Sequence, residues 1–370
     1  MHEHTTAHPT GSHLLQDRIA QAIGEAGGWL GFDRFMALAL YAPGLGYYAN
    51  DSGKFGLLPS SSGGSDFVTA PEMSPLFGAT LATQVAEALE RTGTDEVWEF
   101  GAGTGALAQQ LLDSLGPRVR RYTIVDLSGT LRARQQLRLA AHAGRVHWAD
   151  ALPGRIEGVL VGNEVLDAMP VQLLHRVQGT WHERGVAQGS DGLAWQDRPS
   201  ALRPPCDIPG PHDYLTEIHP QGQAFVRTLA AHVARGAAFW IDYGFPEREY
   251  YHPQRSGGTV MCHQAHRADP DPLADVGAKD ITAHVDFSGI AVAAQDAGWD
   301  VLGYTSQARF LLNCGLAQRM ESAPLAARAM AHRLIAEHEM GELFKVLALS
   351  KGVEPWDALG FTAGDRSHTL

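Results

Sequence analysis

The sequence of 370 residues contains little cysteine, no long apolar run and no excess of positive charge. Its three cysteines, Cys206, Cys262 and Cys314, lie far apart and form no C-x-x-C pair. This spacing excludes a disulfide framework and indicates a reducing compartment. No apolar run is long enough to cross a bilayer. The formal net charge of −12 argues against a general nucleic-acid-binding protein, because phosphate contacts need clustered lysine and arginine.

The first residues lack the features of a targeting segment. They contain several histidines, with neither an apolar core nor an arginine-rich stretch, and so differ from signal and transit peptides. We therefore expect a cytoplasmic protein. The hydrophobic content of 44% and the charged content of 19% are ordinary for a globular protein. The length allows one large domain or two smaller ones.

The most informative segment is a glycine-rich turn between an apolar strand and a helix. Gly101, Gly103 and Gly105 follow a strand expected at 95–100 and precede a helix-like run. Glycines let the chain turn sharply and let a ligand approach the backbone, and the helix start presents N–H groups with a partial positive charge. A second expected strand ends in Asp126, at the distance where α/β proteins place an acid on the ribose hydroxyls of a nucleoside. A helix N-cap is the alternative role of Asp126.

The glycine spacing alone leaves the ligand open. Gly101, Gly103 and Ala106 satisfy G-x-G-x-x-G/A, the dinucleotide fingerprint. The three glycines equally satisfy G-x-G-x-G, which is typical of S-adenosylmethionine methyltransferases. Glu99 favours the second interpretation, because its carboxylate would repel a pyrophosphate and methyltransferases often carry an acid there that faces the methionine end of the cofactor. A tight turn without any ligand is the remaining alternative.

The order of the expected elements predicts an α/β fold with a Rossmann-like sheet. Strands and helices alternate through the first half of the chain, which is typical of a parallel sheet. A late strand pair would add an antiparallel edge. The seven strands are expected at 95–100, 121–126, 145–148, 157–162, 237–243, 299–305 and 343–349. Other segments should form helices within 14–40 and at 75–91, 220–235, 286–297 and 306–340, and a β-hairpin or meander at 171–197.

The same pattern divides the chain into regions. We expect a helical and loop region at 1–78, the cofactor-binding half of the sheet at 79–170, an inserted hairpin and helix at 171–235, the second half of the sheet at 236–350, and a tail at 351–370. A polar insertion occupies 244–285, and a glycine- and serine-rich loop is expected at 51–66. Ligands of such sheets bind at the carboxyl ends of the strands.

Two further groups of polar residues follow strands at this edge. Asp150 follows the third strand and could accept a hydrogen bond from an adenine amino group, or be an ordinary N-cap or loop acid. Asn163, Glu164 and Asp167 follow the fourth strand, and on a helical turn Glu164 and Asp167 would share a face. Adjacent carboxylates repel unless a cation lies between them. A guanidinium meets this need, because two acids can orient it and localise its charge. An ordinary turn with solvated acids is the alternative.

A metal site is not expected. Cys262, His263 and His266 have some likeness to a zinc site, but only one thiol is present and no second pair has the spacing of structural zinc. His266 and His284 are more consistent with a substrate pocket or a structural role.

These motifs together resemble one family, the MidA-type methyltransferases, which include the mitochondrial complex I assembly factor 7. The resemblance rests on Gly44–Tyr48, Asp66–Glu72, Glu99–Gly105, Asn163–Pro170, Asp242–Gly244 and Asp280–Phe287. It implies a class I Rossmann-like fold that binds S-adenosyl-L-methionine, and activity on arginine in a protein partner. The family's glycine loop often reads G-P-G-x-G with a bulky or basic fourth residue, whereas this chain has Ala102 and Thr104.

We therefore predict an S-adenosyl-L-methionine-dependent methyltransferase acting on arginine in a protein. Glu99, the three glycines, Asp126 and Asp150 would hold the cofactor. Glu164 and Asp167 would hold the acceptor, and Asn163 could orient either of them. We expect a protein substrate, no nucleic acid, no membrane span and no metal, and leave the oligomeric state open. The alternatives are a non-catalytic assembly or scaffold protein that binds the cofactor, and an NAD(P)-dependent oxidoreductase.

Overall fold

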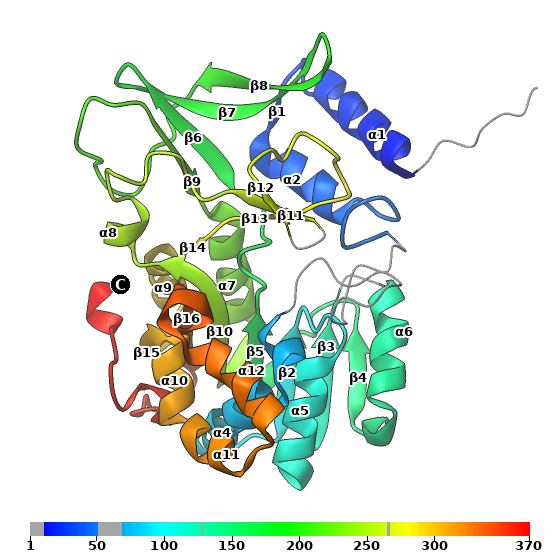
Figure 1. Ribbon diagram of the computed structural model, residues 1–370, viewed down its shortest axis with the longest axis vertical. Coiled ribbons are helices and arrows are strands. Elements are labelled where there is room, and N and C mark those ends of the chain that lie inside the picture. The colour runs from blue at the N-terminus through cyan, green and yellow to red at the C-terminus, as the bar shows by residue number, and fades with distance from the viewer. Residues whose placement is uncertain (1–10, 51–68, 127–128, 265–266) are drawn as a thin grey trace, which may run out of the picture. The chain divides into compact units, whose positions relative to one another are not determined.

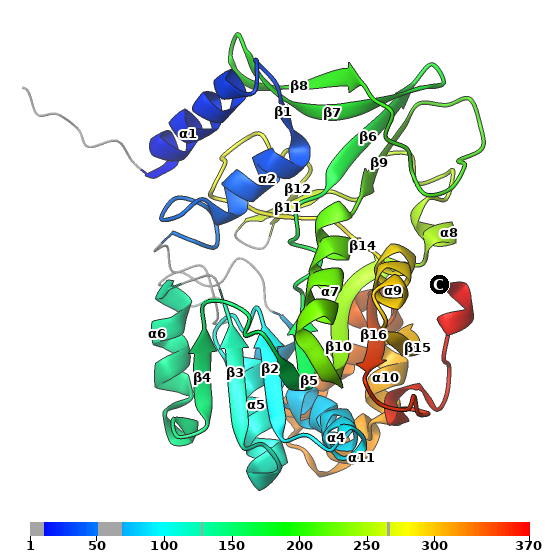
Figure 2. The same ribbon diagram turned by 180° about the vertical axis from the view of Figure 1, so that it is seen from behind.

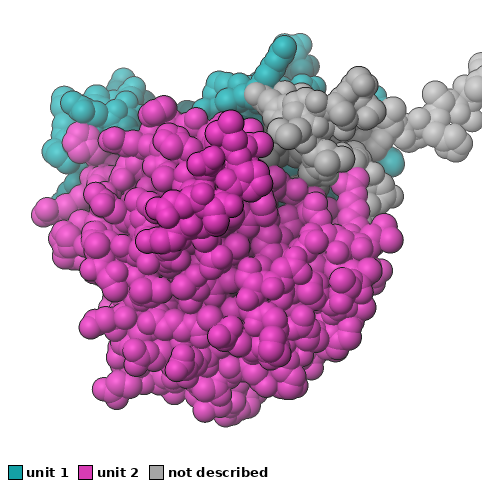
Figure 3. All heavy atoms as spheres, turned by 60° about the horizontal axis from the view of Figure 1, so that its bottom comes forward, with its two compact units in different colours: residues 1–52, 170–218, 253–283 teal, residues 53–169, 219–252, 284–370 magenta. Residues whose placement is uncertain are grey.

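The computed structural model describes residues 11–50, 69–126, 129–264 and 267–370 (Figure 1). The chain forms two compact units, coloured separately in Figure 3. The first unit combines residues 1–52, 170–218 and 253–283, and the second combines 53–169, 219–252 and 284–370. The loop expected at 51–66 lies outside the described residues, as does His266. In the described part of the chain, no helix has both the length and the apolarity to span a membrane.

The second unit is built on a mostly parallel sheet with strand order β15-β16-β10-β5-β2-β3-β4, and β14 pairs with β10. The strands are β2 (Glu96–Phe100), β3 (Arg121–Val125), β4 (Val146–Ala149), β5 (Ile156–Asn163), β10 (Val233–Phe245), β14 (Val285–Asp286), β15 (Asp300–Ser306) and β16 (Phe344–Lys351). Strand β16 runs antiparallel to both β10 and β15. The predicted α/β fold with seven main strands is confirmed, including the late antiparallel pair.

Helices cover both faces of this sheet (Figures 1 and 2). They are α3 (Ala70–Met73), α4 (Pro75–Thr92), α5 (Ala106–Leu115), α6 (Gly129–Arg138), α7 (Pro220–His232), α8 (Glu247–Tyr250), α9 (Phe287–Asp296), α10 (Gln307–Asn313), α11 (Leu316–Ser322) and α12 (Leu325–Ile335), with shorter helical turns at Gly116–Arg118, Ala140–His142, Glu337–Gly341, Leu359–Phe361 and Ser367–Thr369. Side chains of α4, α5, α10 and α12 share one apolar cluster, and those of α7 and α9 share the other.

The apolar sequence of the central strands follows from burial on both faces. Val97 packs in the cluster with α4 and α5, whereas its neighbour Trp98 packs in the cluster with α7 and α9. Successive strand residues point to opposite faces, so a strand covered on both sides is apolar at most of its positions. The carboxyl ends of β2, β3, β4 and β5 meet at one edge of the sheet because these strands run parallel.

The first unit is mainly antiparallel. One sheet has the order β1-β7-β6-β9 with β8 paired to β7, and a second has the order β12-β11-β13. The elements are α1 (Gly11–Glu25), β1 (Leu30–Gly31), α2 (Phe32–Tyr41), β6 (Gln172–Val177), β7 (Thr180–Gly189), β8 (Gly192–Pro199), β9 (Tyr214–Ile218), β11 (Met261–Gln264), β12 (Arg267–Asp269) and β13 (Asp280–Thr282). Gln178 and Gly179 both have positive φ, as a two-residue hairpin turn requires. The meander predicted at 171–197 is therefore confirmed.

Candidate functional site

The glycine turn lies in the second unit, between β2 and α5. Gly101, Gly103 and Gly105 have φ values of +64°, +52° and +83°, in the left-handed region that favours glycine. A Cβ on Gly101 would lie 3.0 Å from the Cγ2 of Val165, whereas a Cβ on Gly103 would meet no atom of the described residues within 4 Å. The turn therefore presents open backbone at Gly103, where a ligand could approach closely.

Asp126 follows β3 and is linked to the glycine turn by Gln135, a residue that the sequence analysis missed. The Gln135 Nε2 donates to Asp126 Oδ2 at 2.9 Å and to the Gly103 carbonyl at 2.8 Å. Trp148 Nε1 on β4 donates to Gln135 Oε1 at 2.8 Å. These contacts join the ends of three parallel strands through one side chain of α6.

Glu99 is the buried acid of this cluster, with 2% of its surface exposed. Tyr122 Oη on the neighbouring strand donates to Glu99 Oε2 at 2.7 Å. Burial raises the pKa of Glu99 to about 8; the hydrogen bond from Tyr122 opposes this shift and the charge of Asp126 adds to it. Glu99 therefore exchanges its proton close to neutral pH.

Asp150 is not part of this cluster. It follows β4, its side chain is 83% exposed, and its Oδ1 lies 3.1 Å from the Nη2 of Arg132 on α6. An exposed ion pair of this kind contributes little to stability, so the side chain can exchange partners easily.

The Thr104 hydroxyl has a hydrogen-bond partner, Glu72, that was not predicted from the sequence. The hydroxyl donates to Glu72 Oε1 and contacts Arg138 Nη1. Arg138 Nη1 in turn donates to Glu72 Oε1 at 2.6 Å. The fourth position of the glycine loop is thus fixed by a polar network that joins α3 to α6.

The second group of predicted residues follows β5, but it does not form a helical turn. Glu164 has a φ of +54°, and its backbone N–H donates to the Ile241 carbonyl at 2.8 Å. Asn163 Nδ2 donates to Glu164 Oε1 at 2.9 Å. The prediction that Glu164 and Asp167 share a helical face is therefore wrong, since the chain leaves the helical region at Glu164.

Asp242 explains the shape of this turn. Its Oδ2 accepts the backbone N–H groups of Val165, Leu166 and Asp167, at 3.1, 2.9 and 3.2 Å. Three successive N–H groups on one carboxylate oxygen form an anion-binding arrangement of the backbone. Burial and the charges of Asp167 and Glu164 hold the pKa of Asp242 well above its usual range, while the N–H groups oppose that shift. The sequence predicts Asp242 near the end of a strand, but it contains no signal for the hydrogen bonds that Asp242 accepts from these three N–H groups.

Asp167 is the most enclosed acid after β5, with 4% of its surface exposed. Its Oδ2 accepts the Tyr243 hydroxyl. Burial raises the pKa of Asp167 to about 6, against the effect of that hydrogen bond. Among the described residues, the buried Oδ1 atoms of Asp167 and Asn163 have no hydrogen-bond partner of good geometry, although the backbone N–H groups of Ala168 and Asp167 also act to lower the pKa of Asp167. Two buried acceptors without donors are unusual in native proteins and point to a ligand or water.

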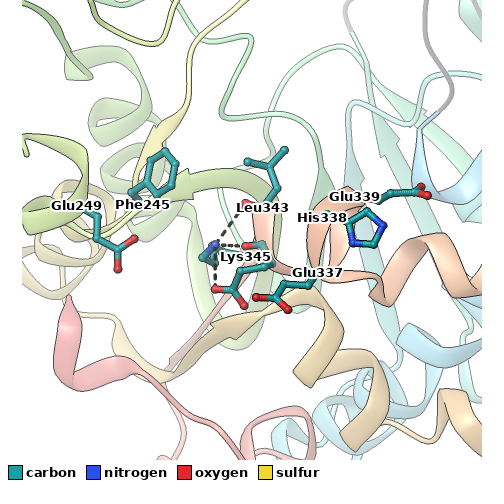
Figure 4. A pocket seen from close by; sticks show the side chains of 8 residues that line it. Phe245, Glu249, Glu337, His338, Glu339, Leu343 and Lys345 are labelled. Atoms are coloured by element: carbon teal, nitrogen blue, oxygen red, sulfur yellow. Dashed lines mark hydrogen bonds and ion pairs between the residues drawn. The ribbon is translucent and has the colours of Figure 1, made fainter. Parts of the chain in front are cut away.

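A surface pocket of about 350 Å³ lies in the second unit, where the end of β10 pairs with the start of β16 (Figure 4). It is lined by Phe245, Glu249, Glu337, His338, Glu339, Glu342, Leu343 and Lys345. The buried Lys345 donates to the backbone carbonyls of Glu342 and Leu343, and burial lowers its pKa. Glu339 and Glu342 form ion pairs with Arg333 and Arg366. None of the predicted site residues lines this pocket, and we assign it no ligand.

The described residues contain no group of three or more histidine, cysteine, aspartate or glutamate side chains placed to hold a metal ion. His266, one of the three residues in the zinc interpretation of the sequence, lies outside the described residues.

A family model described as "Putative S-adenosyl-L-methionine-dependent methyltransferase" matches residues 80–305. Among curated proteins, the chain is 24% identical over 365 residues to the protein arginine methyltransferase NDUFAF7 homolog, mitochondrial, of Caenorhabditis elegans, covering 85% of this chain and 81% of the relative. It is 26% identical over 333 residues to human NDUFAF7, covering 77% and 73%.

Among solved structures, the fold matches a COG1565 superfamily member from Burkholderia thailandensis bound to S-adenosyl-homocysteine. The TM-score is 0.93 at 50% identity, over 98% of this chain and 100% of the other. A native structure from the same organism matches with a TM-score of 0.88 at 49% identity, over the same shares of the two chains.

The names of the curated relatives correct one expectation from the sequence. They describe mitochondrial proteins, which contradicts the cytoplasmic location expected from the composition and the first residues. The solved relatives come from Burkholderia thailandensis.

Proposed function

The chain belongs to the family of S-adenosyl-L-methionine-dependent methyltransferases that matches residues 80–305, and we propose that it methylates arginine in a protein partner. The arginine acceptor is supported by the names of relatives that are about a quarter identical to it. The observation that carries the proposal is the pair of buried acceptors without donors, Asn163 Oδ1 and Asp167 Oδ1. The dinucleotide alternative loses its support, because the solved relative at 50% identity holds S-adenosyl-homocysteine.

We propose that the cofactor is held along the glycine turn. The open backbone at Gly103 fits a ligand that approaches without meeting a side chain. Asp126 would accept the ribose hydroxyls, and Glu99 would face the methionine end. Gly101 and Gly105 would keep the turn in shape through their left-handed conformations. Asp150 would contact the adenine amino group only after leaving Arg132.

We propose that the acceptor binds beside the turn after β5. A guanidinium carries five N–H donors and no acceptor, which fits the unmet acceptors of Asn163 and Asp167. Glu164 is half-buried beside them and would localise the positive charge on one side of the guanidinium. One nitrogen would then direct its lone pair at the methyl carbon for in-line displacement: the N–C bond would form as the S–C bond breaks, and the proton lost by that nitrogen would pass to the Glu164 carboxylate or to solvent.

The work of the chain's residues is positioning and electrostatics. When bound, S-adenosylmethionine supplies a methyl group on a sulfonium that loses its charge in the transfer. Asp167 is ionised above pH about 6, so a charged Asp167 is available near neutral pH. Tyr243, which donates to Asp167 Oδ2, would keep Oδ1 turned toward the acceptor.

The first test combines methyl transfer with cofactor binding. Purified protein and the Glu164→Gln variant would be incubated with tritiated-methyl S-adenosylmethionine and matched peptides that carry arginine or lysine. We expect label on the arginine peptide with the parent protein. We expect turnover to fall about 100-fold or more in Glu164→Gln, because a charge-assisted hydrogen bond is lost, while calorimetric binding of the cofactor is unchanged.

Three outcomes would contradict parts of this proposal. Normal turnover in Glu164→Gln would refute its acceptor role. Label on lysine alone would refute the arginine assignment. Cofactor binding without methyl transfer to any peptide or to proteins of a cell lysate would favour the scaffold alternative.

A further inference from the structure

Gln135 is a polar side chain on the buried face of α6, with 0% of its surface exposed. It lies four residues from each of Leu131 and Leu139, which are also buried, so all three occupy one helical face. A buried amide is tolerated when its donors and acceptor are satisfied. The contacts of Gln135 therefore show what the residue does in the fold.

The orientation of the Gln135 amide is fixed by its partner on β4. An indole N–H can only donate, so the atom of Gln135 that lies 2.8 Å from Trp148 Nε1 must be the carbonyl oxygen Oε1. The amino group then faces Asp126 and the Gly103 carbonyl. Reversing the amide would place two donors against each other at Trp148 and two acceptors against each other at Asp126.

The two acceptors of the Gln135 amino group come from different strands. Asp126 Oδ2 and the Gly103 carbonyl both lie within 2.9 Å of Nε2, so they also lie close to each other. Two oxygens with partial or full negative charge repel at such a separation. The amino group of Gln135 bridges the two oxygens and offsets their repulsion.

We propose that Gln135 is a positioning residue of the cofactor site. It holds Asp126 and the Gly103 peptide in the arrangement that receives the adenosine portion of the cofactor. The inference rests on the proposed role of Asp126 at the ribose, and it adds a residue that contacts neither the reacting atoms nor the acceptor. It acts through Asp126 and Gly103 alone, so its loss should affect cofactor affinity and spare the acceptor side.

The test uses Gln135→Met, which keeps the approximate length of the side chain and removes both N–H donors. We expect the Kd of S-adenosyl-homocysteine, measured by calorimetry on the full chain, to rise about tenfold. The KM for S-adenosylmethionine should rise by a similar factor. The kcat at saturating cofactor should change little.

Gln84→Met is the matched control. Gln84 is also fully buried, and its amide bonds to Glu87 and to the backbone N–H of Gly360 in the same unit. Its partners are distinct from every residue assigned to the cofactor. This variant should lose stability to a similar extent, seen as a lower Tm, and keep the Kd of the parent protein.

A second variant tests the polarity of the contact. Gln135→Glu brings a carboxylate against Asp126 and the Gly103 carbonyl, so cofactor affinity should fall more than in Gln135→Met. Adding Asp126→Asn supplies an amide donor to that carboxylate. If the two substitutions acted independently, their fold-changes in Kd would multiply. The Kd of the double variant should be lower than that product predicts.

Two results would overturn the inference. The first is a folded Gln135→Met variant whose Kd for the cofactor equals that of the parent protein. The second is an equal loss of binding in Gln135→Met and Gln84→Met, since that pattern means general destabilisation. The Kd is measured without a methyl acceptor. If the arginine assignment failed, the parent protein would still bind the cofactor normally. The two failures can therefore be distinguished.

Discussion

Glu99 illustrates how a single buried acid can make cofactor affinity depend on pH. Burial raises its pKa from an ordinary value of 4.5 to about 8. Between these values the folded protein keeps a proton that the unfolded chain has released. Protein stability therefore falls as the pH rises through this range. Burial disfavours the negative charge of Glu99, and a cation at the methionine end of the cofactor would stabilise that charge.

We therefore predict that cofactor affinity rises with pH. Titrations of S-adenosylmethionine from pH 6 to pH 9 should show the Kd falling as Glu99 ionises near pH 8. In Glu99→Gln the corresponding slope should be lost, because the side chain no longer titrates. Ionisation of the ligand itself affects both proteins equally, so the difference between their slopes isolates Glu99. Parallel slopes would show that Glu99 does not face the cationic part of the cofactor.

The stability of the same two proteins gives an independent check. The contribution of Glu99 to the free energy of unfolding should decline between pH 4.5 and 8 by up to about 1.4 kcal/mol per pH unit. The Glu99→Gln variant should show a flatter profile in urea unfolding.

At the scale of elements, the glycine turn and the strands were predictable because their signals are local. The positions of Gly101, Gly103 and Gly105 follow from a backbone that needs positive φ at each. Gln135 was missed because α6 is rich in arginine, a composition typical of a solvent-exposed helix. Its spacing from Leu131 and Leu139 was the available signal.

The turn after β5 could not be predicted from its own sequence. Its shape depends on Asp242, which is 75 to 77 residues from the N–H groups that it accepts. Local spacing suggested a helical turn from Glu164 to Asp167, and a distant carboxylate imposed a different one. The candidate residues were identified, but their geometry required the tertiary fold.

The glycine turn yields a prediction with a control in the same unit. Gly103→Ala places a methyl group in the open space beside the turn and strains a residue at φ +52°. Gly93→Ala imposes similar strain at φ +61° at the end of α4, where a Cβ also meets no atom within 4 Å. Each variant should lose about 1–2 kcal/mol of stability.

Only the variant in the turn should affect the ligand. Gly103→Ala should weaken S-adenosyl-homocysteine about tenfold or more in calorimetric titrations, because the methyl group occupies the path of approach. Gly93→Ala should bind like the parent protein. Equal affinities of the two variants would mean that the cofactor does not approach the backbone at Gly103.

At the scale of the molecule, every residue proposed to hold the cofactor belongs to the second unit. Glu99, the glycines, Asp126 and Gln135 lie in a continuous part of the chain from β2 to α6. The first unit has its own sheets, with β7 and β8 forming a long antiparallel pair. Cofactor binding should therefore stabilise the two units to different extents.

Hydrogen exchange followed by mass spectrometry tests this expectation. At a concentration of S-adenosyl-homocysteine 100 times its Kd, binding stabilises the native state by about 2.7 kcal/mol. Amides of β2, β3 and α6 that exchange by opening of the second unit should slow about 100-fold. Amides of β7 and β8 should exchange at unchanged rates, and NADH should slow neither group. Equal protection of β7 and β8 would show that the first unit opens only together with the second, and a response to NADH alone would contradict the assigned cofactor.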